Sequence, residues 1–313
     1  MANLERVENI YVLGSTTRDE ITRIRTRFSD HLSLGQQQGI NFTTAIDSEY
    51  SYLGGTGINI ACNLRQFCDK DIYLFSVVGK DNIDVLNTLA NHRIKPDYLQ
   101  IREDYGTSKA KAIIDQDNNH IWLIEDSVTK ETHLAHPVSV EGDKSLAIIA
   151  PIRKSLFVEF TSWAIENDVD YVFDPGMLLA SLSEGELLKG INSSRWLIAN
   201  ETEMRGLLSK AGITFDEIRA KGINIIVTRG ANGAIFYDRL SEYEAPGLTP
   251  SVVADTSGAG DAWRAAFWGS LVMGDTLEHS LAMANSWASF SVEKHGAIAN
   301  YPPLEEAKKR AQL

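Results

Sequence analysis

A short glycine-rich segment in the last third of the chain combines the features of an anion-binding turn with a carboxylate. Residues 255–261 read Asp-Thr-Ser-Gly-Ala-Gly-Asp, between the β-branched pair Val252–Val253 and a long apolar helical pattern. Small residues at such a junction predict a tight turn whose free amides begin a helix, where phosphate or a developing oxyanion binds well. Asp261 ends the turn as a proton acceptor. Together these groups could move a phosphoryl group onto an alcohol.

The helix predicted after Asp261 is apolar nearly all round, which indicates a buried element. Its conspicuous charge is Arg264, three residues from Asp261 and therefore on the same face. Arg264 could pair with Asp261 and keep that carboxylate ionised, or it could hold a substrate oxygen. It could equally form a buried structural ion pair. The residues alone leave these alternatives open.

Most of the chain alternates between apolar strand patterns and helical patterns. This alternation predicts a doubly wound α/β fold with a mostly parallel sheet. We expect strands at 10–13, 72–78, 146–149, 171–173, 196–198 and 223–228, with helices at 82–92, 155–167, 183–190 and 201–210.

Polar residues follow several of the apolar segments. In open parallel sheets, ligands bind beyond the carboxyl ends of the strands, so these residues are expected to gather at one edge. They are Asp19, Asp174, Asn200, Thr228 and Asp255.

Two regions depart from the strand–helix rhythm. Apolar residues tend to alternate along 42–52, and 107–114 and 121–124 flank an Asp-Asn-Asn turn. We expect these strands to form a small β lid, about 40–53 and 106–125, inserted in a single domain that spans residues 1–313. Residues 16–30, charged and rich in Arg and Thr, predict a surface excursion instead.

The composition of the chain limits the classes of protein to which it can belong. The chain has 313 residues and a formal net charge of −12. This balance argues against a nucleic-acid partner or an anionic membrane surface, each of which needs a basic face. Cys62 and Cys68 match no zinc spacing and predict no disulfide framework. With no apolar leader at Met1–Asn9 and no run of 18 apolar residues, we expect a cytoplasmic protein without a membrane span.

Four motifs together resemble the PfkB, or ribokinase-like, family of sugar and nucleoside kinases. Residues 255–261 resemble the second signature of this family, and 54–61 (Gly-Gly-Thr-Gly-Ile-Asn-Ile-Ala) resemble its first. Between them, 200–203 resemble the Asn-x-x-Glu motif, and 227–233 resemble the strand and turn that hold the nucleotide. Four motifs in the order of the family, spread over most of the chain, argue against coincidence.

The resemblance implies an ATP-dependent kinase that transfers the γ-phosphoryl group to a primary hydroxyl of an adenosine-like nucleoside or of a sugar. Asp261 would be the general base, and the backbone amides of Gly258, Ala259 and Gly260 would form the anion hole. The resemblance assigns the acceptor to Asp19, Gly55, Asn59 and Arg264, and ATP to Asn200, Glu203, Thr228, Gly230 and Gly233, with Glu203 positioning Mg²⁺ through water.

Two further properties of the family stay open for this chain. Some members bind a monovalent cation such as K⁺ beside the anion hole, and the carbonyl near Asp255 is compatible with such a site. Lid sheets of the family sometimes pair between subunits. Tyr50 and Tyr52, on one face of a lid strand, are compatible with a homodimer contact and equally with packing inside the lid.

The acceptor-binding parts depart from the adenosine kinase-like, nucleoside kinase branch that the chain resembles most. Where that branch has glutamines for the nucleoside, this chain has Met177 and Leu178, which cannot hydrogen-bond a base. At the end of the lid, Glu125 and Asp126 would disfavour phosphorylated acceptors if they face the site. A kinase of a free sugar or polyol therefore remains an alternative. So does a non-catalytic nucleotide- or sugar-binding regulator, although Asp261 argues against it.

Overall fold

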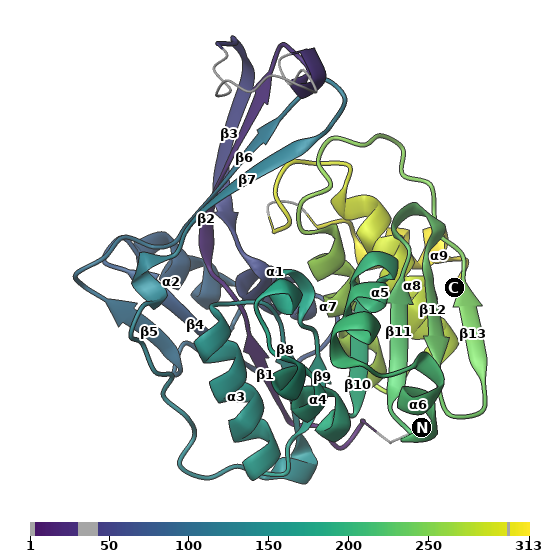
Figure 1. Cartoon of the computed structure of the whole chain (residues 1–313). Helices are drawn as coiled ribbons and strands as arrows, with labels where there is room; N and C mark the ends of the chain where they lie inside the picture. The colour runs from purple at the N-terminus through teal and green to yellow at the C-terminus, as the bar shows by residue number, and fades with distance from the viewer. Residues whose placement is uncertain (1–3, 31–42, 299–300) are drawn as a thin grey trace.

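The structure is a computed structural model, and it describes residues 4–30, 43–298 and 301–313. Within these ranges nine strands form one sheet in the order β13-β12-β11-β10-β9-β8-β1-β4-β5 (Figure 1). All neighbouring strands are parallel except β12 and β13 at one edge, as predicted for a doubly wound sheet. The strands are β1 (Asn9–Leu13), β4 (Asp71–Gly79), β5 (Leu99–Arg102), β8 (Ser145–Ile149), β9 (Asp170–Phe173), β10 (Trp196–Asn200), β11 (Asn224–Thr228), β12 (Ala234–Tyr237) and β13 (Glu242–Ala245).

Helices cover both faces of this sheet, and each face has its own hydrophobic core. Successive side chains of a strand point to opposite faces, so Ile10 and Val12 of β1 enter one core and Tyr11 and Leu13 enter the other. The first core includes α1 (Thr56–Leu64), α2 (Ile83–Asn91), α7 (Ala259–Val272), α8 (Leu277–Ser291) and α9 (Leu304–Ala311). The second includes α3 (Lys154–Glu166), α4 (Glu184–Ser193), α5 (Glu201–Ala211) and α6 (Phe215–Ala220).

A second sheet, the lid sheet, projects from the main body (Figure 1). In the described part of the chain its order is β3-β2-β6-β7, with strands β2 (Thr17–Ile24), β3 (Ile46–Gly54), β6 (Lys109–Ile114) and β7 (His120–Glu125). Strands therefore lie in both segments expected to form the lid, although 40–42 fall outside the described residues. The surface excursion predicted for 16–30 is wrong. Most of that segment is β2, an inner strand of the lid sheet whose buried and half-exposed residues alternate.

The expected strands and helices lie within a few residues of their predicted bounds. The β-branched pair Val252–Val253 belongs to no strand and is exposed, so the segment before the glycine-rich turn is a surface loop. It is joined to the main body where Asp255 N donates to Val292 O at 3.2 Å. β5, β12, β13 and α6 were not predicted. Among the described residues, no helix combines the length and apolarity needed to cross a membrane.

Candidate active site

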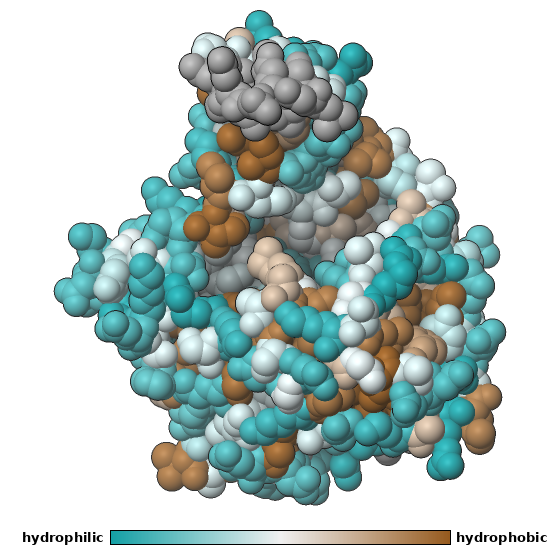
Figure 2. Space-filling model, in the orientation of Figure 1, coloured by the Kyte–Doolittle hydropathy of each residue, from teal (hydrophilic) through white to brown (hydrophobic). Residues whose placement is uncertain are grey.

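A cavity of about 620 Å³ lies between the lid sheet and the carboxyl edge of the main sheet. Figure 2 shows the hollow below the lid sheet. Five of the predicted site residues line it: Asp19, Gly55, Asn59, Gly258 and Asp261. These five define what we call the transfer end of the cavity.

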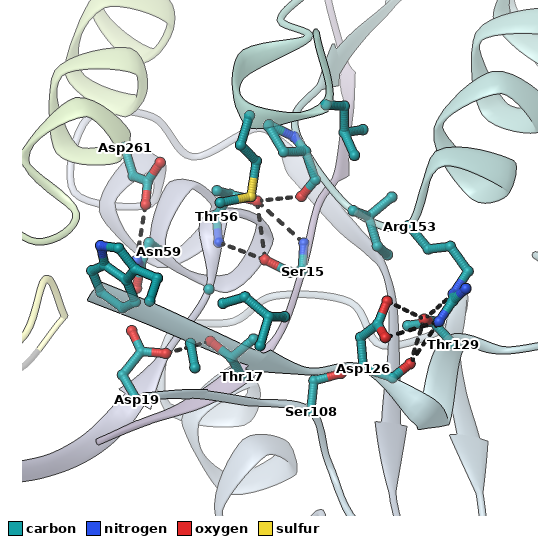
Figure 3. A pocket seen from close by; sticks show the side chains of 18 of the residues that line it. Ser15, Thr17, Asp19, Thr56, Asn59, Ser108, Asp126, Thr129, Arg153 and Asp261 are labelled. Carbon is teal, nitrogen blue, oxygen red and sulfur yellow. Dashed lines mark hydrogen bonds and ion pairs between the residues drawn. The ribbon is translucent and has the colours of Figure 1, made fainter. Parts of the chain in front are cut away.

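The carboxylate of Asp261 is held by the side chain of Asn59. Asn59 Nδ2 donates to Asp261 Oδ2 at 2.9 Å (Figure 3). Asn59 is itself buried, and its Oδ1 has no hydrogen-bond partner among the described residues. A buried acceptor without a partner is costly, so Oδ1 is a natural receptor for a substrate hydroxyl. Burial raises the pKa of Asp261 to about 6, against the opposing effects of Arg264 and Asn59.

Gly258 gives the backbone the turn that the sequence predicted. It has φ 74°, a left-handed conformation, and it caps the N-terminus of α7 without any side-chain cap. A Cβ added there would lie 2.4 Å from Ala297 Cβ and 3.2 Å from Asn59 Nδ2. Ala259, Gly260 and Asp261 follow as the first turn of α7, where Ala259 N donates to Thr256 O at 3.3 Å and the next amides begin the helix beside the base.

Asp19 approaches the same end of the cavity from the lid sheet. Its position was expected beyond the edge of the main sheet, but it lies within β2. Its Oδ1 accepts from Thr17 Oγ1, and a Cβ on Gly54 would lie 2.2 Å from Oδ2, so only glycine leaves room for this carboxylate. Asp19 is buried, and this burial raises its pKa to about 6.

Asp255 organises the loop before Gly258. It is buried, and its Oδ1 accepts from Ser257 N at 2.9 Å. Its Oδ2 accepts from Tyr52 Oη at 2.6 Å and from Gly296 N at 3.4 Å. Tyr52 belongs to β3, so this hydrogen bond connects the lid sheet directly to the loop that precedes the anion-binding turn.

Arg264 does not line the cavity. Its Nε forms an ion pair with Asp174, which follows β9, and its Nη1 donates to Gly260 O at 3.0 Å. The side chain is 13 % exposed and that of Asp174 is 2 % exposed. Arg264 therefore forms the buried structural ion pair, with Asp174 as the partner in place of Asp261. Its charge still favours the ionised form of Asp261.

The residues expected to bind the nucleotide lie at the carboxyl edge of the main sheet, outside the cavity lining. Asn200 ends β10 and Thr228 ends β11, directly opposite each other in register. Asn200 and Glu203 form a capping box on α5, with both side-chain-to-backbone hydrogen bonds at 2.8 Å. That explains both residues structurally, without a ligand. Gly230 and Gly233 flank the short turn after β11, both with positive φ.

The other end of the cavity, its distal end, carries an ion pair. Arg153 Nη2 contacts Asp126 Oδ1 at 2.9 Å, and Arg153 Nε donates to Thr129 Oγ1 at 2.7 Å. Figure 3 shows these residues across the cavity from Asp19, Asn59 and Asp261. Asp126 lines the cavity, whereas Glu125 turns back to accept from Ser127 N.

The strand register places residues of β2, β6 and β7 side by side on the cavity-facing side of the lid sheet. Asp19 pairs with Ala110, and Ala110 pairs with Ile124. Trp122, Ile124 and Asp126 alternate along the chain and all line the cavity, so they share one face of β7 and its extension. Regular strand spacings place the backbones of Asp19 and Asp126 roughly 12 Å apart. Trp122 is 41 % exposed and lines this space.

Several lining residues were not predicted as site residues. Ser15 and Thr17 follow β1, and Arg153 follows β8, so the rule that selected Asp174 could have selected them as well. Met177 and Leu178, which depart from the nucleoside kinase pattern, also line the cavity.

Comparison with known proteins decides the family. Residues 44–304 match the pfkB family of carbohydrate kinases. The chain belongs to this family. It is 27 % identical to a nucleoside kinase of Methanocaldococcus jannaschii over 309 residues, 98 % of each chain. It is 37 % identical to a deoxyribokinase of Salmonella typhi over 268 residues, covering 81 % of this chain and 85 % of that protein.

Solved structures agree with this family assignment. The crystal structure of the M. jannaschii nucleoside kinase, an archaeal member of the ribokinase family, superposes with a TM-score of 0.84 and covers 98 % of both chains. A Burkholderia thailandensis nucleoside kinase in complex with inosine, 22 % identical, has the same fold, with a TM-score of 0.82 over 97 % of both chains. The predicted fold and enzyme class are confirmed: this chain is a phosphotransferase that phosphorylates an alcohol group of a nucleoside or sugar, with ATP as donor.

Proposed function

We propose that the acceptor is a nucleoside, phosphorylated on its primary hydroxyl with Asp261 as general base. The observation that carries this proposal is the length of the cavity. Carboxylates stand at both ends, with the backbones of Asp19 and Asp126 roughly 12 Å apart, and hydroxyl and apolar side chains line the space between them (Figure 3). A free pentose would occupy the transfer end alone. A nucleoside would reach both ends.

At the transfer end, Asp19 and Asn59 bind and orient the acceptor hydroxyls. Asp261 accepts the proton of the attacking hydroxyl, a contribution typically worth 10²–10⁴-fold. The amides of Gly258, Ala259 and Gly260, at the positive end of α7, stabilise the charge on the transferring phosphoryl group. The lid sheet excludes water, which otherwise competes as nucleophile.

ATP binds along the carboxyl edge of the main sheet, at Thr228, Gly230 and Gly233. Mg²⁺, when bound, neutralises charge on the phosphates. No group of three or more His, Cys, Asp or Glu side chains among the described residues forms a metal cage. That fits an ion held mainly by phosphates and water, with Asn200 and Glu203 as outer partners. We also expect a cytoplasmic enzyme, in keeping with two buried free cysteines.

A free-sugar kinase is the second candidate. The relative with 37 % identity is a deoxyribokinase, which acts on a sugar without a base. In that case the distal end would hold water or a small group, and Asp126 and Arg153 would have no partner in the substrate. A K⁺ site near Asp255 and a homodimer through the lid sheet are compatible with either candidate.

Product identification separates the two candidates. The purified chain is incubated with ATP, Mg²⁺ and, in parallel, ribose, deoxyribose, inosine, adenosine, uridine or cytidine, and the products are identified by ³¹P NMR and mass spectrometry. We expect nucleoside 5′-monophosphates, with kcat/KM for the best nucleoside well above that for either sugar. Asp261→Asn should retain ATP binding and lose at least about 100-fold in kcat. Phosphorylation of deoxyribose or ribose, with none of any nucleoside, overturns the nucleoside assignment.

A further inference from the structure

The ion pair at the distal end offers hydrogen bonds of both polarities to a ligand in the cavity. Asp126 provides carboxylate oxygens, which only accept, and Arg153 provides a guanidinium, which only donates. Both side chains are partly exposed, 42 % for Asp126 and 27 % for Arg153. Arg153 Nη1 has no hydrogen-bond partner among the described residues. The pair can therefore gain contacts with a ligand without first breaking its own ion pair.

The two residues are positioned firmly from separate elements. Asp126 extends the cavity-facing row of β7, after Trp122 and Ile124. Arg153 stands at the N-cap of α3, on the loop after β8, and its Nε is held by Thr129. A planar ligand between the apolar walls would thus meet a donor and an acceptor side by side at a fixed place.

We propose that Asp126 and Arg153 bind the edge of the nucleoside base and select a lactam edge, an N–H beside a C=O, as in 6-oxopurines. This inference rests on the proposed nucleoside kinase function. The carboxylate accepts from the ring N–H, and the guanidinium donates to the carbonyl oxygen. Both bonds are charge-assisted, which makes them stronger than bonds between neutral groups.

The same pair discriminates against other base edges. Adenine presents an unprotonated ring nitrogen, which only accepts, beside an amino group. This amino group is a weaker hydrogen-bond donor than a lactam N–H. Purine riboside has the same ring shape without an edge N–H or an exocyclic group, so the carboxylate gains no bond. A phosphate at this end would meet the charge of Asp126, which disfavours phosphorylated sugars. Met177 and Leu178, which cannot hydrogen-bond, leave polar recognition to the ion pair.

The test compares inosine, adenosine and purine riboside by kcat/KM on the wild type, Asp126→Asn and Arg153→Met. We expect the wild type to prefer inosine over purine riboside by about tenfold or more, because a site built for polar groups rejects ligands that lack them. It should prefer inosine over adenosine in the same direction. Asp126→Asn, which both donates and accepts, should bring the inosine-to-adenosine ratio close to one. Arg153→Met should lower kcat/KM for inosine and leave that for purine riboside within about threefold.

A matched control breaks another ion pair between the lid sheet and the main body. Asp84 of α2 pairs with Arg18 of β2 at 2.7 Å and does not line the cavity. Asp84→Asn should leave the inosine-to-adenosine ratio unchanged. Ratios are measured on one enzyme preparation, so partial unfolding of a variant cancels.

The outcomes separate the two proposals. Turnover of nucleosides with a wild-type ratio near one, or with a ratio that neither variant changes, overturns the role of Asp126 and Arg153 and leaves the nucleoside kinase intact. Turnover of sugars alone overturns both. If Asp84→Asn changes the inosine-to-adenosine ratio as much as Asp126→Asn does, the effect comes from anchoring of the lid sheet. That result also overturns base recognition.

Discussion

At the transfer end of the cavity Asn59 and Asp261 stand on two packed helices and Asp19 stands on the lid sheet, whereas at the distal end the functional side chains stand on a strand extension and a loop. Asn59 lies in the first turn of α1 and Asp261 in that of α7, and these helices pack against each other. Asp126 and Arg153 meet through the guanidinium of Arg153, which contacts both the carboxylate and the backbone carbonyl of Asp126. The first arrangement fixes the reacting groups through buried backbone. The second can change with little effect on the core, so chemistry and selectivity are separable in this fold.

Crowding the transfer end should give the largest effect. Gly258→Val adds a β-branched side chain at φ 74°, where a Cβ already meets Ala297. We expect kcat to fall by at least about 100-fold, because the anion-binding amides lose their positions. KM for ATP should change much less. Steady-state kinetics with the preferred acceptor measures both values.

Thermal unfolding provides the control for this variant. A folded variant with normal kcat would remove the turn from catalysis and would break the contrast between the two ends. A variant that fails to fold is replaced by Gly258→Ala, which carries the same positive-φ strain with a smaller side chain.

The pH dependence of kcat/KM should also be set by the transfer end and not by the distal end. Asp261 must be ionised to accept a proton, and burial raises its pKa to about 6. The active form is therefore lost as pH falls through about 6, well above the normal range of an aspartate. We expect kcat/KM to drop about tenfold per pH unit below this point, more steeply if Asp19, whose pKa is also about 6, must be ionised too.

The variant Asn59→Ala tests whether Asp261 causes the acid limb of the pH profile, the fall in kcat/KM below about pH 6. Loss of the hydrogen bond from Asn59 Nδ2 removes a contact that favours the carboxylate, so the limb should move to higher pH. Asp126→Asn at the distal end should leave the limb in place. A limb near pH 4 in the wild type would contradict the raised pKa of Asp261.

The sequence could predict more of the transfer end than of the distal end. The turn at 255–261 and the helix start at Asn59 are local, and neighbouring residues determine their backbone geometry. Their backbone conformation, a tight turn and two helix starts, was therefore predictable, and their binding roles stay predictions. The pairing of Arg153 with Asp126 joins residues 27 positions apart through tertiary packing, and no local pattern contains it. The strand at Thr17–Ile24 was missed because its many charged residues conceal the alternation that lid burial imposes. Arg264 was placed on the correct helix face, but its partner Asp174 is 90 residues distant.

The smallest effect should come from a hydrogen bond that connects the lid sheet to the loop of the transfer end. Tyr52 Oη donates to Asp255 Oδ2, and burial together with this bond raises the pKa of the tyrosine. Tyr52→Phe removes the bond but leaves Asp255 the amides of Ser257 and Gly296. We therefore expect the loop to keep its shape while the lid sheet loses one anchor. A fewfold fall in kcat should accompany a rise in ATP hydrolysis without acceptor transfer, because water enters more often.

Tyr50→Phe is the matched control, because Tyr50 stacks on His295 through its ring, with centroids 4.0 Å apart. Its hydroxyl has no hydrogen-bond partner in the described part of the chain, so this variant loses no bond and should retain the wild-type ratio of transfer to hydrolysis. An equal rise in hydrolysis in both variants would mean that lid packing, and not the bond to Asp255, controls access of water. An unchanged ratio in Tyr52→Phe would show that the loop before Gly258 and the exclusion of water do not depend on this hydrogen bond.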